Sequence, residues 1–168
     1  MLRLSPVFAR LERDEEVYGL LNSLPSPLLC EMIGFAGYHF VILDMEHLLR
    51  GGDELMHCLR ACETAGVSPW VRVPQVDEKL IGRLLDAGAE AIVLPRVESA
   101  AEVARAIAAA QFPPLGRRGI SGGRSAGFGT LSLPQYIELS NRQPRIVPMI
   151  ESAAGIEALP EILALPGV

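Results

Sequence analysis

"YHFVILDMEHLLRGGDELMHCLRACETAGVSPWVRVP", residues 38–74, contains the pattern that decides the fold. An apolar run rich in β-forming residues is followed by a segment of helical character and then by a second short apolar run. Asp53 is a possible N-cap for the helix, and Gly66 can end it. Neither apolar run alternates with polar residues, which is typical of strands covered on both faces. The stretch therefore predicts two parallel strands joined by a helix.

The same alternation of strand-like and helix-like segments continues along the rest of the chain. Helices are expected where Ser26, Ser99 and similar residues can cap an apolar, helix-period segment. The expected further strands are residues 16–23, 90–97 and 144–152, and the expected further helices are residues 26–37, 77–88, 98–112 and 153–168. Repeated strand–helix units predict an α/β fold, either a (β/α)8 barrel or a doubly wound sheet. The first strand–helix turn has no G-x-G-x-x-G pattern, which argues against dinucleotide binding.

Composition limits the classes of protein that the sequence can encode. The 168 residues predict a single domain, residues 1–168, and the apolar share of 49% is enough for a sizeable core. A net charge of −5 argues against a nucleic-acid partner. Three sparse cysteines outside metal-type pairs suggest reduced thiols. No signal peptide and no run of about 20 apolar residues is present, so we expect a cytoplasmic protein that does not enter the membrane.

The first apolar run ends in an unusual group of polar residues. Asp44 and Glu46 are two positions apart, so an extended backbone directs both side chains to one side, and His47 follows at the strand end. A carboxylate beside an imidazole can orient it and make it a general base. The alternative is that Asp44 caps the next helix and His47 is a solvated loop residue. Because parallel strands of such folds gather chemistry at their carboxyl ends, these three residues are candidate catalytic residues.

Two further strands end in charged residues. Arg72 lies between two valines, where a charge is costly unless it faces a polar pocket or a partner. It can grip a substrate carboxylate, or it can form a structural ion pair with Asp44 or Glu46. Glu151 closes the apolar run of residues 145–150, where a carboxylate can be a metal ligand, an acid–base group or a helix cap.

The loop of residues 112–134 is rich in glycine and arginine. Six glycines lie between Gly116 and Gly129, together with Arg117, Arg118 and Arg124. Glycines allow backbone N–H groups to approach an anion, and arginines supply positive charge. The loop can therefore bind a substrate carboxylate or phosphate through Arg118 and Arg124, or it can be a surface lid with solvated arginines.

Several of these pieces together resemble the HpcH/HpaI aldolase/citrate lyase family. The resemblance runs from about Tyr18 to Val168 and rests on "FVILDMEH", "PWVRVP", "LLDAGAEAIVLPRVESAAEV", "FPPLGRRGISGG" and "VPMIES". It implies a (β/α)8 TIM barrel of metal-dependent class II aldolases that act on pyruvate-type 2-oxo acids, with an aldehyde or carboxylate as the second substrate. It also implies a homo-oligomer, a hexamer in the family.

The resemblance also implies a role for each candidate residue. Arg72 would hold the carboxylate and enolate oxygen of the keto acid, and Glu151 would be a ligand of a divalent metal, Mg²⁺ or Mn²⁺. His47, oriented with Asp44, would act through water as acid and base, and Glu46 would support their hydrogen-bond network. The family's second metal carboxylate would come from a strand beyond Val168, so we expect the chain to be an incomplete, C-terminally truncated barrel from a protein of roughly 250 residues.

One departure from the family pattern leaves the reaction open. Met149 stands where pyruvate aldolases of the family have a glutamine, so the standard substrate contacts are altered. Metal-dependent aldol cleavage or condensation is the leading hypothesis. The alternatives are a siderophore-associated relative that makes citrate from oxaloacetate and acetyl-CoA, and a non-catalytic subunit that binds a keto acid or serves assembly.

Overall fold

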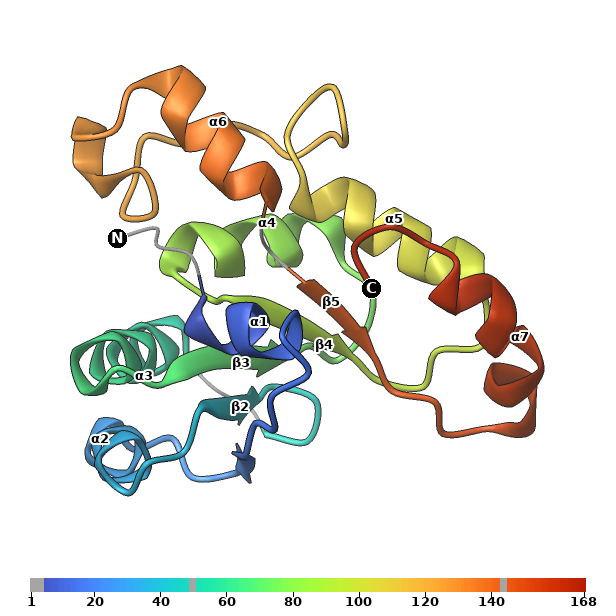
Figure 1. Cartoon of the computed structure of the whole chain (residues 1–168). Coiled ribbons are helices and arrows are strands. Elements are labelled where there is room, and N and C mark those ends of the chain that lie inside the picture. The colour runs from blue at the N-terminus through green and yellow to red at the C-terminus, as the bar shows by residue number, and fades with distance from the viewer. Residues whose placement is uncertain (1–4, 49–50, 143–144) are drawn as a thin grey trace.

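The strands form a single parallel sheet wound in sequence order. The computed structural model describes residues 5–48, 51–142 and 145–168. Five strands lie in the order β1 (Gly19–Asn22), β2 (Phe40–Asp44), β3 (Ser68–Arg72), β4 (Ala91–Leu94) and β5 (Arg145–Pro148), all parallel (Figure 1). A doubly wound sheet reverses its strand order at a switch point, whereas a (β/α)8 barrel does not. The order therefore favours the barrel alternative over the doubly wound one.

Helices connect the strands where the sequence predicts them, with two additions. The helices are α1 (Pro6–Leu11), α2 (Pro27–Phe35), α3 (Gly52–Ala65), α4 (Glu78–Ala87), α5 (Ala100–Ala110), α6 (Leu133–Arg142) and α7 (Ala153–Leu163). Ser26 and Ser99 accept backbone N–H groups as the predicted N-caps. The predicted cap at Asp53 is wrong, because Gly51 is the N-cap and Asp53 lies in the first turn. Helices α1 and α6 were not predicted.

The alternation of side chains along each strand gives the sheet two different faces. Val41, Leu43, Val71 and Ile92 face the layer of helices α2–α5 and form the larger core. Phe40, Trp70 and Val93 face the other side, where α1 packs across the sheet (Figure 1). There the ring of Trp70 stacks on Phe40 with centroids 4.0 Å apart and on Phe8 of α1 at 5.8 Å. We call this second face the inner face, because it would line the interior of a barrel.

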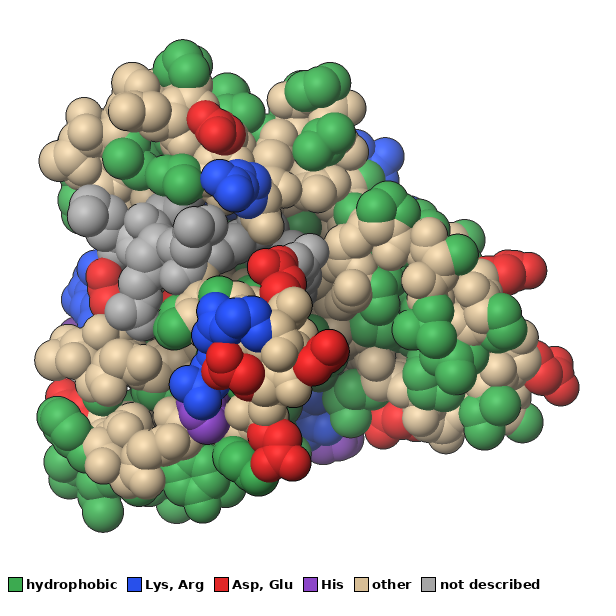
Figure 2. Space-filling model, in the orientation of Figure 1, with side chains coloured by type: hydrophobic (Ala, Val, Ile, Leu, Met, Phe, Trp, Pro, Cys, Tyr) green, Lys and Arg blue, Asp and Glu red, His purple; other side chains and the backbone are tan. Residues whose placement is uncertain are grey.

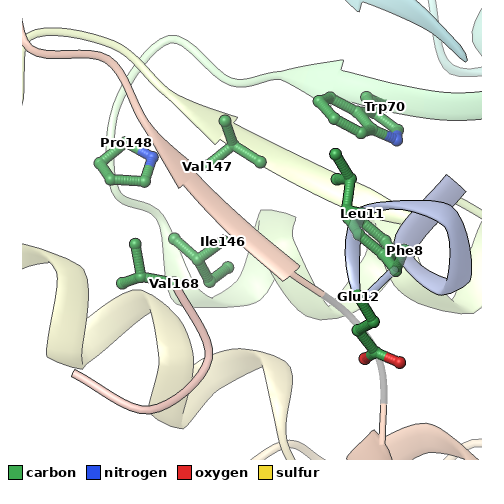
Figure 3. A pocket seen from close by; sticks show the side chains of 8 residues that line it. All are labelled: Phe8, Leu11, Glu12, Trp70, Ile146, Val147, Pro148 and Val168. Carbon is green, nitrogen blue, oxygen red and sulfur yellow. The ribbon is translucent and has the colours of Figure 1, made fainter. Parts of the chain in front are cut away.

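A cavity of about 450 Å³ lies on the inner face between α1 and β5 (Figure 3). Its described lining is apolar apart from Glu12, and it includes Phe8, Trp70 and Val147. None of the candidate catalytic residues lines it. The candidate chemistry therefore does not lie in this cavity.

The outer surface of α2 is apolar. Leu28, Met32 and Phe35 follow the helical spacing i, i+4, i+7, and all three are exposed. In Figure 2 the hydrophobic side chains gather at the lower left, where Figure 1 places α2. The homo-oligomer that the family resemblance implies stays a prediction.

Within the described ranges, no helix has the length and apolar character needed to cross a membrane.

Close packing of α2 on α3 depends on a glycine. Gly34 lies within α2, and a Cβ added there would approach Cβ of Ala65 to 2.6 Å and its carbonyl oxygen to 2.9 Å. The helix continues past Gly34 to Phe35, and Gly37 follows with a φ of 90°. Gly34 is thus a contact residue between helices and not a helix terminator.

We predict that Gly34→Ala lowers the free energy of unfolding by about 1–3 kcal/mol, because the added methyl group forces α2 away from α3. Gly82→Ala is the matched control, since Gly82 lies in α4 with nothing within 4 Å of an added Cβ. That control should be neutral or stabilising by up to about 1 kcal/mol. Urea unfolding of both variants measures the two values, and equal effects would contradict the close approach.

Candidate active site

Asp44 and Arg72 form a buried ion pair at the carboxyl ends of neighbouring strands. They are register partners on β2 and β3, in phase with Phe40 and Trp70, so both side chains extend from the inner face. Nε and Nη2 of Arg72 lie 3.0 Å from Oδ1 and Oδ2 of Asp44, a bidentate contact. Asp44 is 1% exposed and Arg72 is 7% exposed. The ion pair that the sequence offered as an alternative for Arg72 is therefore present.

The contacts of this pair keep both groups ionised. Burial raises the pKa of Asp44, but the hydrogen bond from Arg72, the backbone N–H groups of Glu46 and His47, and the positive charge of Arg72 outweigh it and lower the pKa overall. The hydrogen bond to Asp44 raises the pKa of Arg72, burial opposes this, and the negative charges of Asp44, Glu46 and Glu151 raise it further. The negative charge of Glu151 thus adds to the charges that favour the ionised form of Arg72.

Glu46 connects Arg72 to His47. Oε2 of Glu46 lies 3.1 Å from Nη1 of Arg72 and 3.6 Å from Nε2 of His47. The His47 side chain is 70% exposed, whereas that of Glu46 is 13% exposed. Asp44 instead accepts the backbone N–H of Glu46 at 2.9 Å. Glu46 is thus a described carboxylate beside the imidazole, and Asp44 bonds the backbone N–H of His47, so the expectation that Asp44 orients His47 stays a prediction.

Glu151 extends from the end of β5 and is held by the end of β4. Val147 and Met149 pack on the inner face, so Glu151 follows in the same alternation. Its Oε2 accepts the backbone N–H of Arg96 at 2.8 Å, and Arg96 has a φ of 52°. Sequence reasoning did not identify this contact, because a left-handed arginine has no composition signal. Its place directly after β4 was the available indication.

Arg118 and Arg124 lie away from these residues. Nη2 of Arg118 is 2.6 Å from Oδ1 of Asp86, and its guanidinium lies over the ring of Phe112 at 4.7 Å. Arg124 pairs with Glu63. Asp86 and Glu63 belong to the last turns of α4 and α3, at the end of the sheet where strands begin. The prediction that Arg118 and Arg124 join the substrate-binding residues is therefore corrected for this chain: both guanidinium groups are engaged at the opposite end.

Glu151 is the residue that fits a divalent cation. It is exposed, and only its Oε2 has a hydrogen-bond partner among the described residues. No group of three or more His, Cys, Asp or Glu side chains within the described ranges is arranged to hold a metal ion. Mg²⁺ keeps several waters and needs only one or two protein carboxylates. A hydrated hard cation is therefore compatible with Glu151, and the described chain supplies one carboxylate toward its coordination.

Known proteins share this arrangement of strands. A hydroxypyruvate/pyruvate aldolase of Paraburkholderia phytofirmans is 37% identical over 171 residues, covering 98% of this chain and 65% of the relative. The structure of an HpcH/HpaI aldolase from Desulfitobacterium hafniense has a TM-score of 0.90 at 33% identity, covering 96% of this chain and 63% of that one. The structure of citrate synthase SbnG has a TM-score of 0.86 at 32% identity, covering all of this chain and 63% of that one.

The chain thus spans just under two thirds of the length of these proteins. The family model described as HpcH/HpaI aldolase/citrate lyase matches residues 18–168, which include Asp44, Arg72 and Glu151. The parallel α/β fold, the order of the strands and the sequence match all point to the same family. This chain belongs to the HpcH/HpaI aldolase/citrate lyase family.

Proposed function

We propose that the protein is a metal-dependent carbon–carbon lyase that cleaves or forms aldols of 2-oxo acids. The observation that carries the proposal is the buried contact of Arg72 with Asp44 and Glu46 at the carboxyl ends of β2 and β3, with Glu151 after β5 at the same edge of the parallel sheet. This is the end of a (β/α)8 barrel at which active sites lie. The aldolase name of the Paraburkholderia relative supports the same reaction class.

Arg72 is suited to bind the donor keto acid. A guanidinium has five N–H groups, and the contacts with Asp44 and Glu46 use one on each nitrogen. One N–H on each terminal nitrogen is left for the substrate's carboxylate and carbonyl oxygen. Because the two acids fix the plane of the guanidinium, these N–H groups are already oriented before the substrate binds. They stabilise the negative charge that develops on the oxygen when an enolate forms.

Glu46 and His47 are suited to move protons at the exposed side of the site. In the condensation direction, C3 of pyruvate loses a proton, a bond forms from C3 to the aldehyde carbon, and the aldehyde oxygen gains a proton. In cleavage these events run in reverse, and no oxidant or reductant is needed. His47, next to the carboxylate of Glu46, exchanges these protons through water.

Glu151 is the proposed ligand of the metal, and the backbone of Arg96 holds its carboxylate in place. A divalent cation held by Glu151 would supply positive charge to an enolate oxygen. Arg72 would add positive charge from the direction of β3.

We predict that Glu151→Gln weakens binding of Mn²⁺ at least about 10-fold, because the amide removes the negative charge that attracts the cation. Isothermal titration with Mn²⁺ measures the affinity, and NMR measures proton–deuterium exchange at C3 of pyruvate. The exchange should be lost in the variant and in wild-type protein treated with a chelator. Glu157→Gln on the exposed side of α7 is the matched control and should change neither value. Unchanged affinity in Glu151→Gln would contradict the assignment.

A second candidate reaction is the formation of citrate from oxaloacetate and acetyl-CoA. It is favoured by the match with citrate synthase SbnG, which covers the whole chain at a TM-score of 0.86. The same positive charges would stabilise an enolate in this reaction.

Release of free thiol from acetyl-CoA in the presence of oxaloacetate distinguishes the two reactions. We predict no thiol release above the rate without protein, together with metal-dependent exchange at C3 of pyruvate. Thiol release that depends on oxaloacetate, without exchange into pyruvate, would select the citrate-forming reaction instead.

A further inference from the structure

Arg96 occupies a strained position beside the proposed metal ligand. It follows β4 by two residues, and its φ of 52° lies in the left-handed region that non-glycine residues rarely adopt. Residues held in this conformation cluster at functional sites. The backbone N–H of Arg96 donates to Oε2 of Glu151 at 2.8 Å. This hydrogen bond does not account for an arginine side chain at this position.

The guanidinium of Arg96 has no ion pair with any described carboxylate. The residue is exposed, and its backbone touches the carboxylate of Glu151, so its side chain starts at the site. An arginine carries its charge at the end of a long side chain. The group is therefore able to reach a ligand bound next to Glu151.

The other described arginines discussed above already have partners or a proposed ligand, whereas the guanidinium of Arg96 has none among the described residues. Arg72 is shared between Asp44 and Glu46, and its two remaining N–H groups suffice for one bound keto acid. Arg118 and Arg124 are engaged at the opposite end of the sheet. Arg72 and the metal proposed at Glu151 both act on the donor keto acid. Among the described residues, Arg96 is an exposed cation beside the site that is left for an anionic acceptor.

We propose that Arg96 binds the anionic group of the acceptor aldehyde, and that the enzyme therefore prefers aldehydes carrying a carboxylate over neutral ones. This inference rests on the proposed aldol reaction. The side chain selects the acceptor, whereas the backbone N–H positions Glu151, so the two contributions are separable by substitution of the side chain alone.

Two acceptors of matched size test the proposal. Glyoxylate carries a carboxylate where glycolaldehyde carries a neutral hydroxymethyl group. Each is condensed with pyruvate in the presence of Mn²⁺, and the aldol product is quantified by NMR. We compare wild type, Arg96→Met, Arg96→Lys and the control Arg105→Met, which removes an exposed arginine from the outer helix α5. Exchange of the C3 protons of pyruvate is measured for all four without any aldehyde.

Arg96→Met should lower kcat/KM for glyoxylate by about 10- to 100-fold, the range expected for loss of a charge-assisted contact. The ratio of its kcat/KM for glyoxylate to its kcat/KM for glycolaldehyde should fall by the same factor, whatever the change in the exchange rate. Arg96→Lys should recover part of the glyoxylate activity, and Arg105→Met should match wild type.

The remaining outcomes overturn the proposal in distinguishable ways. Equal loss with both aldehydes and in pyruvate exchange would show that Arg96 acts only through Glu151. Unchanged selectivity in Arg96→Met would show that the guanidinium does not contact the acceptor. Absence of both pyruvate exchange and aldol formation in the wild type would instead overturn the proposed function, and the inference with it.

Discussion

The bidentate ion pair between Asp44 and Arg72 is the interaction on which the site depends. Burying two charges is costly, and removing one partner of such a pair leaves an uncompensated charge in the protein interior. Here the strand register places the two residues directly opposite each other, so the sheet itself makes the pair. The backbone N–H groups after β2 satisfy Asp44 further. The result is a guanidinium whose plane is fixed before any substrate arrives.

The rest of the site is arranged around this fixed cation. Glu46 contacts Arg72 from the turn after β2 and connects it with the exposed imidazole of His47. Glu151 comes from β5 and is held by the backbone of Arg96 after β4. These residues follow β2, β4 and β5, so the parallel winding brings together side chains that are far apart in the sequence. The helices and the close contact at Gly34 hold the strands in that arrangement.

Features that depend on local sequence were predictable. The apolar strands, the caps Ser26 and Ser99 and the left-handed Gly66 follow from residue type and spacing, and all are present. The expectation that Asp44 and Glu46 share one side also agrees with their common contact, Arg72. Helix α6 was not predicted, because the glycine-rich segment that precedes it in the sequence indicated only a loop.

Features that depend on distant partners were not predictable. Nothing near Arg118 or Arg124 in the sequence indicates that they form ion pairs with Asp86 and Glu63, which are 32 and 61 residues away. The contact of Glu46 with both Arg72 and His47 depends on the register that places Arg72 opposite Asp44. The hydrogen bond from the backbone of Arg96 likewise depends on Glu151, a residue 55 positions later.

The pH dependence of unfolding tests the central ion pair most directly. The ordinary pKa of Asp44 is 3.8 and folding lowers it, so its contribution to stability is complete above that pH and is lost as the pH falls through the lower, folded value. Asp44→Asn should therefore unfold about 3 kcal/mol more easily than wild type at pH 7, and the difference should shrink below about pH 4. Urea unfolding of both proteins from pH 7 to pH 3 measures it. A difference that is absent at pH 7, or that stays constant down to pH 3, would contradict the account.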